Sequence, residues 1–170
     1  MDARNEGDST PGSHRTAVDR SDRELVVTRT VNAPARLVFD AWSQSELFKR
    51  WWIPKSCGLT LVSCELDVRV GGSYRLMILP PGAPEPMAFF GRYLEVIPNA
   101  RISWTNEEGD EPGPVTTVTF EEKDGKTQVV VRDLYPSKEA LDAAIASGST
   151  SGMGESLDQL EAFLGELGAA

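Results

Sequence analysis

The chain has 170 residues, 40% of them hydrophobic and 25% charged, which is the composition of one globular domain with a sizeable core. Lys and Arg number 17 against 26 Asp and Glu, so the formal net charge is −9. Such an acidic chain repels phosphate backbones and anionic lipid surfaces, which argues against nucleic-acid and membrane partners. No apolar run reaches the roughly 18 residues of a membrane span, and the N-terminus lacks the apolar centre of a signal peptide, so we expect a cytoplasmic protein.

Residues 1–22 contain almost no large apolar side chains, and we expect them to form a disordered N-terminal tail before a domain at 23–170. The only histidine, His14, lies in this tail, which leaves the domain without the commonest general base. Cys57 and Cys64 are too few and wrongly spaced for a zinc site, and we expect both to be reduced.

The folded part opens with a β-branched run at residues 24–31, which predicts a strand. Two short helices are expected next. The first has apolar residues at helical spacing, and Pro34 suits its first turn. The second follows an S-x-x-E capping box formed by Ser43 and Glu46, and it ends before Pro54.

From residue 61 the period of the apolar residues changes to two, which predicts a half-buried strand. Its core face carries Val62, Cys64, Leu66, Val68 and Val70. Gly71 and Gly72 are expected to supply the positive φ angles of a tight hairpin. Further strands are predicted at 73–79, 87–96, 101–105, 115–121 and 127–133, which makes seven in all.

The C-terminal part is predicted to be helical. A short helix is expected over residues 136–146, and after a Gly/Ser break an apolar stripe indicates a long amphipathic helix. The stripe consists of Met153, Leu157, Leu160, Leu164 and Leu167. Strands followed by such a helix indicate an α+β fold, with the helix on the hydrophobic face of an antiparallel sheet.

Five motifs occur in a specific order: NAPARLVFDAW, FKRWWIP, DVRVGGSYR, GRYLEVIPNARISWT and SGMGESLDQLEAFL. Together they resemble the family named after the activator of heat-shock-protein-90 ATPase, in its short bacterial form, within the START-like and pollen-allergen-like helix-grip superfamily. The resemblance spans residues 25–167. It implies a curved antiparallel sheet of about six or seven strands wrapped around the last helix, with an apolar cavity between sheet, helix and the paired short helices. Family members often carry Gly-Trp where this chain has Gly152 and Met153, which implies a wider or more adaptable cavity rim.

Adjacent residues on a helix point about 100° apart, so Trp51 and Trp52 cannot both face the same core. In one arrangement one indole belongs to the core and its neighbour to the cavity mouth; in the other, both are packing residues. The other candidate positions lie on single faces of their strands and of the last helix, and a packed core would use them too. The candidate ligand-binding residues are Trp51, Trp52, Tyr74, Leu76, Ile78, Phe89, Tyr93, Trp104, Met153, Leu157 and Leu160.

The resemblance implies binding of a small hydrophobic or amphipathic molecule. Two alternatives stay open: a chaperone co-factor, and a cyclase- or hydratase-like enzyme acting on a hydrophobic substrate. For acid–base work the carboxylates to consider are Glu95, Asp67 and Asp133, and a buried Glu95 would need Arg75 or Arg92 as partner. No G-x-S-x-G, phosphate loop, C-x-x-C or metal-spaced cluster occurs. We therefore assign no catalytic or metal-binding residue, expect no cofactor, and favour a binding protein over an enzyme.

Overall fold

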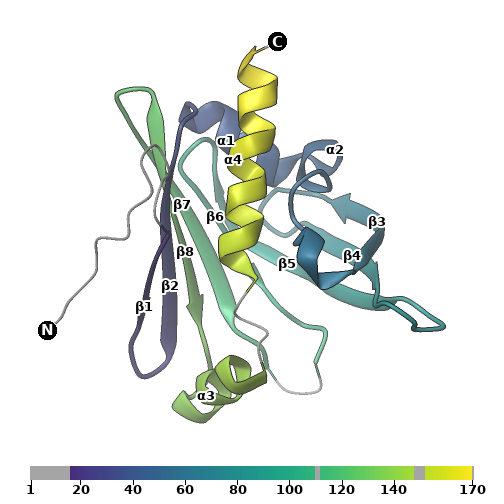
Figure 1. The fold of residues 1–170 in the computed structure, drawn as a ribbon. Coiled ribbons are helices and arrows are strands. Elements are labelled where there is room, and N and C mark those ends of the chain that lie inside the picture. Colours follow the sequence, from purple (N-terminus) through teal and green to yellow (C-terminus); the bar gives the residue numbers. More distant parts are fainter. Residues whose placement is uncertain (1–15, 110–111, 148–151, 170) are drawn as a thin grey trace, which may run out of the picture.

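The structure, a computed structural model, describes residues 16–109, 112–147 and 152–169 and shows one curved antiparallel sheet whose concave face is crossed by the C-terminal helix (Figure 1). The strands are β1 (Thr16–Arg20), β2 (Glu24–Val31), β3 (Thr60–Leu66), β4 (Ser73–Leu79), β5 (Met87–Ile97), β6 (Arg101–Thr105), β7 (Val115–Lys123) and β8 (Lys126–Leu134). The helices are α1 (Ala35–Ser43), α2 (Ser45–Phe48), α3 (Lys138–Ser147) and α4 (Met153–Ala169), with a 3₁₀ turn at Lys55–Cys57. Their sheet order is β1-β2-β8-β7-β6-β5-β4-β3, with every neighbouring pair antiparallel.

The core lies between the concave face of the sheet and the apolar stripe of α4. Leu157, Leu160 and Leu164 of this stripe are almost fully buried, as are the alternate residues of β2 that face them. Because one stripe of the helix and one face of the sheet are apolar, burying them against each other is the main driving force for this arrangement. The predicted α+β layering is confirmed. No helix within the described residues is long and apolar enough to cross a membrane.

β1 lies within residues 1–22, which the sequence analysis predicts to be a disordered tail. For residues 16–20 that prediction is wrong, because they form a strand. The strand pairs along β2, with Thr16 opposite Arg29 and Arg20 opposite Leu25. The short segment has little apolar surface of its own, but the open edge of β2 presents backbone groups that need partners, and pairing satisfies them. The sheet therefore has eight strands instead of the seven predicted.

The strand predicted at residues 61–70 ends earlier and has a bulge. β3 stops at Leu66, and its register shifts between Leu61 and Ser63. Since a bulge adds one residue, it reverses the alternation of faces, and Val62 becomes 54% exposed. The prediction that Val62 and Val70 share the core face is wrong: Val70 lies beyond the strand and is exposed as well.

Two predicted local signals are absent from the structure. α1 runs to Ser43, so this residue is helical and cannot cap α2, whose N-cap is Gln44 without a side-chain hydrogen bond. In the β3–β4 loop Gly71 has a positive φ of 85°, whereas Gly72 does not. Gly72 is needed for a different reason: a Cβ there would lie 2.0 Å from the carbonyl oxygen of Asp67.

Residues 51–57 form a strap that is tied to the first turns of α4. Gln159 donates from Nε2 to the carbonyl oxygens of Trp51 and Ile53, both at 2.8 Å, and its Oε1 accepts from the Lys55 backbone N–H at 2.9 Å. The Ser156 hydroxyl donates to the Trp52 carbonyl at 2.7 Å. The strap has no regular backbone ladder, so these side chains of α4 supply the partners that its peptide groups need.

We predict that Gln159→Glu destabilises the fold, because the carboxylate keeps the acceptor for Lys55 but loses both donors and faces two carbonyl oxygens. The expected cost is about 1–3 kcal/mol in the free energy of unfolding, measured with urea. The reverse exchange Glu166→Gln, at an exposed position of the same helix, serves as control and should change stability by less than about 0.5 kcal/mol. Equal effects of the two variants would contradict the role given to Gln159.

Candidate functional site

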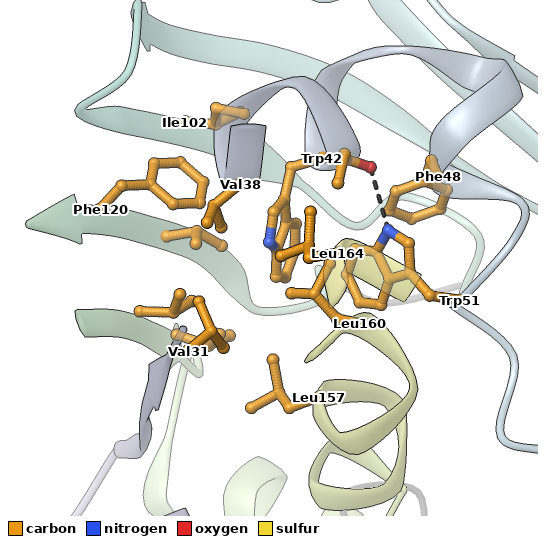
Figure 2. Packing of buried hydrophobic residues seen from close by; sticks show 14 of the residues in the cluster. Val31, Val38, Trp42, Phe48, Trp51, Ile102, Phe120, Leu157, Leu160 and Leu164 are labelled. Carbon is orange, nitrogen blue, oxygen red and sulfur yellow. Dashed lines mark hydrogen bonds between the residues drawn. The ribbon is translucent and has the colours of Figure 1, made fainter. Parts of the chain in front are cut away.

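The centre of the core is an aromatic cluster built around Trp42 of α1. Its ring centroid lies 4.8 Å from that of Trp51, 5.8 Å from Trp52, 6.0 Å from Trp104 and 6.2 Å from Phe120. Most of these contacts are edge-to-face, the geometry that aromatic pairs prefer. In Figure 2 the Trp42 ring stands between the sheet and the leucines of α4. The cluster thus joins α1, the strap and the sheet under α4.

The two fully buried indoles of this cluster differ in their hydrogen bonding. Trp51 is 1% exposed and donates from Nε1 to the Ala41 carbonyl oxygen at 3.0 Å, the dashed line in Figure 2. Trp42 is 2% exposed, and its Nε1 has no hydrogen-bond partner within the described residues. A buried donor without an acceptor loses its hydration and gains nothing in return.

All the candidate ligand-binding residues lie together in this one core cluster. The buried ones are Trp51, Tyr74, Leu76, Ile78, Tyr93, Leu157 and Leu160, and the partly buried ones are Trp52, Phe89, Trp104 and Met153. Of the two adjacent indoles, Trp51 is the core residue, whereas Trp52 is half-buried and stacks on Phe48 at 4.8 Å. Their positions are those of packing residues, and a role in ligand binding stays a prediction.

The titratable side chains of the cluster are held neutral. Burial raises the pKa of Tyr74 and of Tyr93 well above the ordinary phenol value, and burial raises the pKa of Cys64 to about 11. The Tyr74 hydroxyl donates to the Thr105 carbonyl oxygen at 2.8 Å. None of these three groups is therefore suited to act as a base or nucleophile near neutral pH.

A hollow of about 400 Å³ opens at the margin of the core, where the first turn of α4 passes over β1 and β2. Its lining combines apolar side chains with a few polar ones: Thr16, Val18, Asp19, Arg20, Leu25, Val27, Ile145, Met153 and Gly154. Although Val18 faces the same side as buried Val27, it is 62% exposed. A second hollow, of about 510 Å³, is lined by Ser21, Asp22, Arg23 and Leu134, all exposed, and is a depression of the surface.

Met153 is the candidate ligand-binding residue that lines the hollow at β1 and β2. Sequence reasoning misses the other lining residues because half of them come from β1, a strand it does not predict. A signal was available: in TAVDR, Thr16, Val18 and Arg20 alternate with Ala17 and Asp19, and a short SDR turn leads into the clear strand that follows. Such alternation predicts that Thr16, Val18 and Arg20 share one face.

The carboxylates considered for acid–base work are far from forming a pair. Glu95 binds Arg101 at 3.3 Å, and not Arg75 or Arg92 as expected for a buried acid. Asp67 binds Arg69. Asp133 is partly buried and accepts a hydrogen bond from Thr116. The described part of the chain contains no group of three His, Cys, Asp or Glu that could hold a metal ion.

Comparison with known families settles the family. The sequence profile described as Activator of Hsp90 ATPase homolog 1-like protein matches residues 32–165. The chain belongs to this family. The resemblance drawn from the five motifs is therefore confirmed. Among curated proteins, none is similar enough in sequence to count as a match.

Solved structures of bacterial proteins have the same fold. A protein of Nitrosomonas europaea is 22% identical, with a TM-score of 0.79 over 89% of this chain and 100% of its own. A Staphylococcus epidermidis protein is 29% identical, with a TM-score of 0.74 over 88% of this chain and 93% of its own. An AHSA1-like protein of Aeromonas hydrophila is 18% identical, with a TM-score of 0.67 over 85% of this chain and 95% of its own. The helix-grip fold is thereby confirmed.

The two buried indoles make a matched pair for mutation. Trp51→Phe removes a satisfied donor and leaves the Ala41 carbonyl without it, whereas Trp42→Phe removes a donor that has no acceptor. We predict that both variants lose packing energy, but that Trp51→Phe costs about 1 kcal/mol more in the free energy of unfolding. Urea unfolding of both variants measures the difference. Equal costs would mean that the Trp42 N–H finds an acceptor in solution.

Burial raises the pKa of Asp133 above its usual 3.8, while the hydrogen bond from Thr116 acts in the opposite direction. A carboxyl whose pKa is higher in the folded state binds its proton more tightly there, so wild-type stability falls as the pH rises through the interval between the unfolded and folded pKa values. Asp133→Asn keeps an acceptor for Thr116 and cannot ionise. We predict that its stability relative to wild type increases as the pH rises above the ordinary carboxyl value of 3.8, measured by urea unfolding. A difference that shrinks as the pH rises would contradict this.

Proposed function

We propose that this protein binds a small amphipathic molecule in the hollow between β1, β2, α3 and the first turn of α4. The observation that carries the proposal is the hollow itself, whose volume of about 400 Å³ lies within the range of small-molecule sites. Its lining is mainly apolar, and its polar residues are Thr16, Asp19 and Arg20 of β1, of which Thr16 and Arg20 share one strand face. A few polar groups in an apolar concavity are the usual composition of a ligand site.

The exposure of the walls supports binding of a guest. Val18 is 62% exposed and Ile145 is 37% exposed, although both line a concavity at the edge of the main core. Covering these side chains would remove apolar surface from water, at about 25 cal/mol per Å². The core beneath is already packed, so a guest in the hollow requires no rearrangement of the aromatic cluster.

The family description names an activator of Hsp90 ATPase, which keeps a chaperone co-factor role as a second candidate. That role rests on the family alone, whereas the hollow is an observation on this chain. An enzymatic role is less well supported, because each of the carboxylates considered for it binds a different partner: Arg101 for Glu95, Arg69 for Asp67 and Thr116 for Asp133. Ligand binding is therefore the function that the geometry favours.

Met153 offers a direct test, since a bulkier side chain at this position fills the hollow. A panel of fatty acids, flavonoids and polyketide-like aromatics is first titrated against the wild type by calorimetry. For any compound that binds, we predict that Met153→Trp weakens the affinity at least about tenfold, because the indole occupies the volume of the guest. The matched control is Met87→Trp, at an exposed position of β5 outside the hollow, and it should leave the affinity within about twofold.

Two outcomes would overturn this proposal. One is the absence of saturable binding across the whole panel. The other is a bound compound whose affinity is the same for the wild type and for Met153→Trp, since the guest would then occupy another part of the molecule.

A further inference from the structure

The hollow is polar at both ends, and the two ends differ. Thr16, Val18 and Arg20 lie on one face of β1, opposite Arg29, Val27 and Leu25 of β2. Because directly opposed side chains of an antiparallel pair point to the same face, Arg20 stands on the concave side, at the end of an apolar wall. Asp19 alternates with these residues, so its Cα–Cβ bond points toward the convex side, although the residue still borders the hollow.

At the Thr16 end, the cation is fully engaged. Arg29 is buried and donates to Asp158 and Glu161 of α4 and to the Thr16 hydroxyl. Its charge is matched by two carboxylates, so this end offers no attraction for a further anion. The end formed by Thr16 is neutral or acidic toward a guest.

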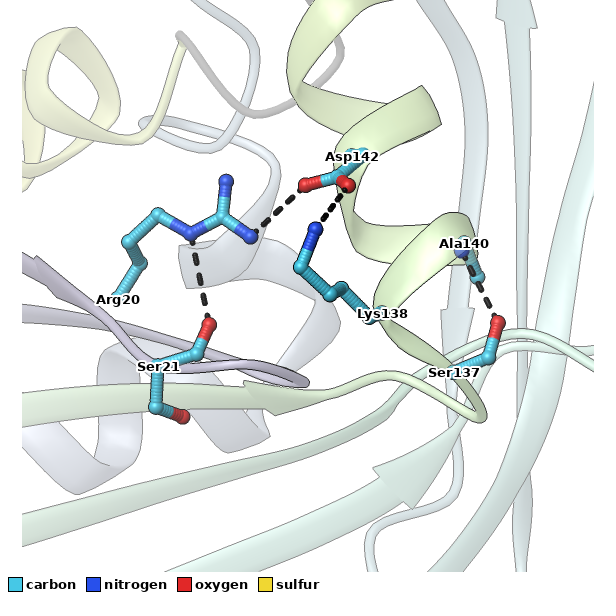
Figure 3. A network of polar contacts seen from close by, with 6 residues as sticks. All are labelled: Arg20, Ser21, Ser137, Lys138, Ala140 and Asp142. Atoms are coloured by element: carbon cyan, nitrogen blue, oxygen red, sulfur yellow. Dashed lines mark hydrogen bonds and ion pairs between the residues drawn. The ribbon is translucent and has the colours of Figure 1, made fainter.

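At the Arg20 end, two cations share one carboxylate. Arg20 donates from Nη2 to Asp142 Oδ1 at 2.9 Å, and Lys138 binds the other oxygen of the same carboxylate at 2.9 Å (Figure 3). One acid is thus shared by two cations, and Glu139 of α3 also interacts electrostatically with Lys138. The pKa of Asp142 is lowered by the hydrogen bonds from Lys138 and Arg20, so the shared carboxylate stays ionised.

Arg20 also keeps donor capacity. Its Nε lies 3.4 Å from the Ser21 carbonyl oxygen and its Nη2 binds Asp142, but Nη1 makes no hydrogen bond within the described residues. In Figure 3 this nitrogen carries no dashed line. Arginine presents its donors as a planar fork that fits the two oxygens of a carboxylate. The side chain is 40% exposed, so a small oxyanion can reach it.

We propose that the guest of the hollow is an anionic amphiphile, with its apolar body on Val18, Leu25 and Val27 and its carboxylate bound by Arg20. This inference rests on the proposed function and specifies the chemical class of the ligand. The guest carboxylate takes the open donor of Arg20, while Asp142 keeps its bonds to Arg20 and Lys138. Ile145 and Met153 cover the body of the guest from the helical side.

The test compares three probes of equal chain length: decanoate, decanol and decylamine. Each is titrated by calorimetry, below its aggregation concentration, against the wild type, Arg20→Gln and a control variant, Arg36→Gln, at an exposed arginine of α1. The wild type is expected to bind decanoate about tenfold more tightly than decanol, since one charge-assisted hydrogen bond is worth about that factor. Decylamine is expected to bind most weakly of the three. Arg20→Gln should abolish this preference while its affinity for decanol stays within about twofold of the wild-type value. Arg36→Gln should behave as the wild type.

The remaining outcomes separate the two proposals. If the wild type binds decanol and decanoate equally, or prefers decylamine, the anionic ligand class is wrong and the hollow still binds a guest. If Arg20→Gln weakens decanol and decanoate to the same extent, Arg20 supports the shape of the hollow only, and the inference is wrong. If no probe and no compound of the wider panel binds, the proposed function itself fails.

Discussion

A buried guanidinium on the concave face determines where the C-terminal helix lies. Arg29 of β2 is 6% exposed and binds Asp158 and Glu161, one turn apart on α4, together with Thr16 of β1. A buried cation without these partners would be strongly unfavourable, so the sheet and the helix have one relative position in which the charge is matched. Within the described residues the Nε of Arg29 has no partner, which makes the two carboxylates of α4 all the more necessary.

The rest of the concave side follows from the position of α4. The leucines of α4 cover the aromatic cluster. In the first turns of the helix, Gln159 and Ser156 hold the strap against the core. The helix begins at Met153, however, whereas β1 continues along β2 as far as Arg20. The last part of the strand pair is therefore left partly uncovered by α4. Ile145 of α3 lines the hollow there. The hollow forms because α4 does not extend over the whole length of the β1–β2 pair.

The sequence predicts those elements whose apolar residues repeat without interruption. The strands at 24–31, 73–79 and 101–105 have the predicted bounds, and the first two bury alternate residues along their length. The bulge at Val62 has no local signal, since it depends on how β3 pairs with β4. β1 has too little apolar surface to stand alone and becomes a strand only beside β2. The candidate site illustrates a further limit: alternation shows which face a residue takes, but not which part of that face a distant helix leaves open.

The interior and the margin of this fold have different physical properties. A guest in the interior would have to displace aromatic rings that already contact each other, and the protein would lose their packing energy before it gained any contact with the guest. At the margin the side chains that would touch a guest, Val18 and Ile145, are exposed already, so binding adds burial and removes none. The fold can then be stable without its ligand. The WW pair belongs to the interior: the Trp51 indole is buried in the aromatic cluster, and the backbone carbonyls of Trp51 and Trp52 accept hydrogen bonds from Gln159 and Ser156 of α4.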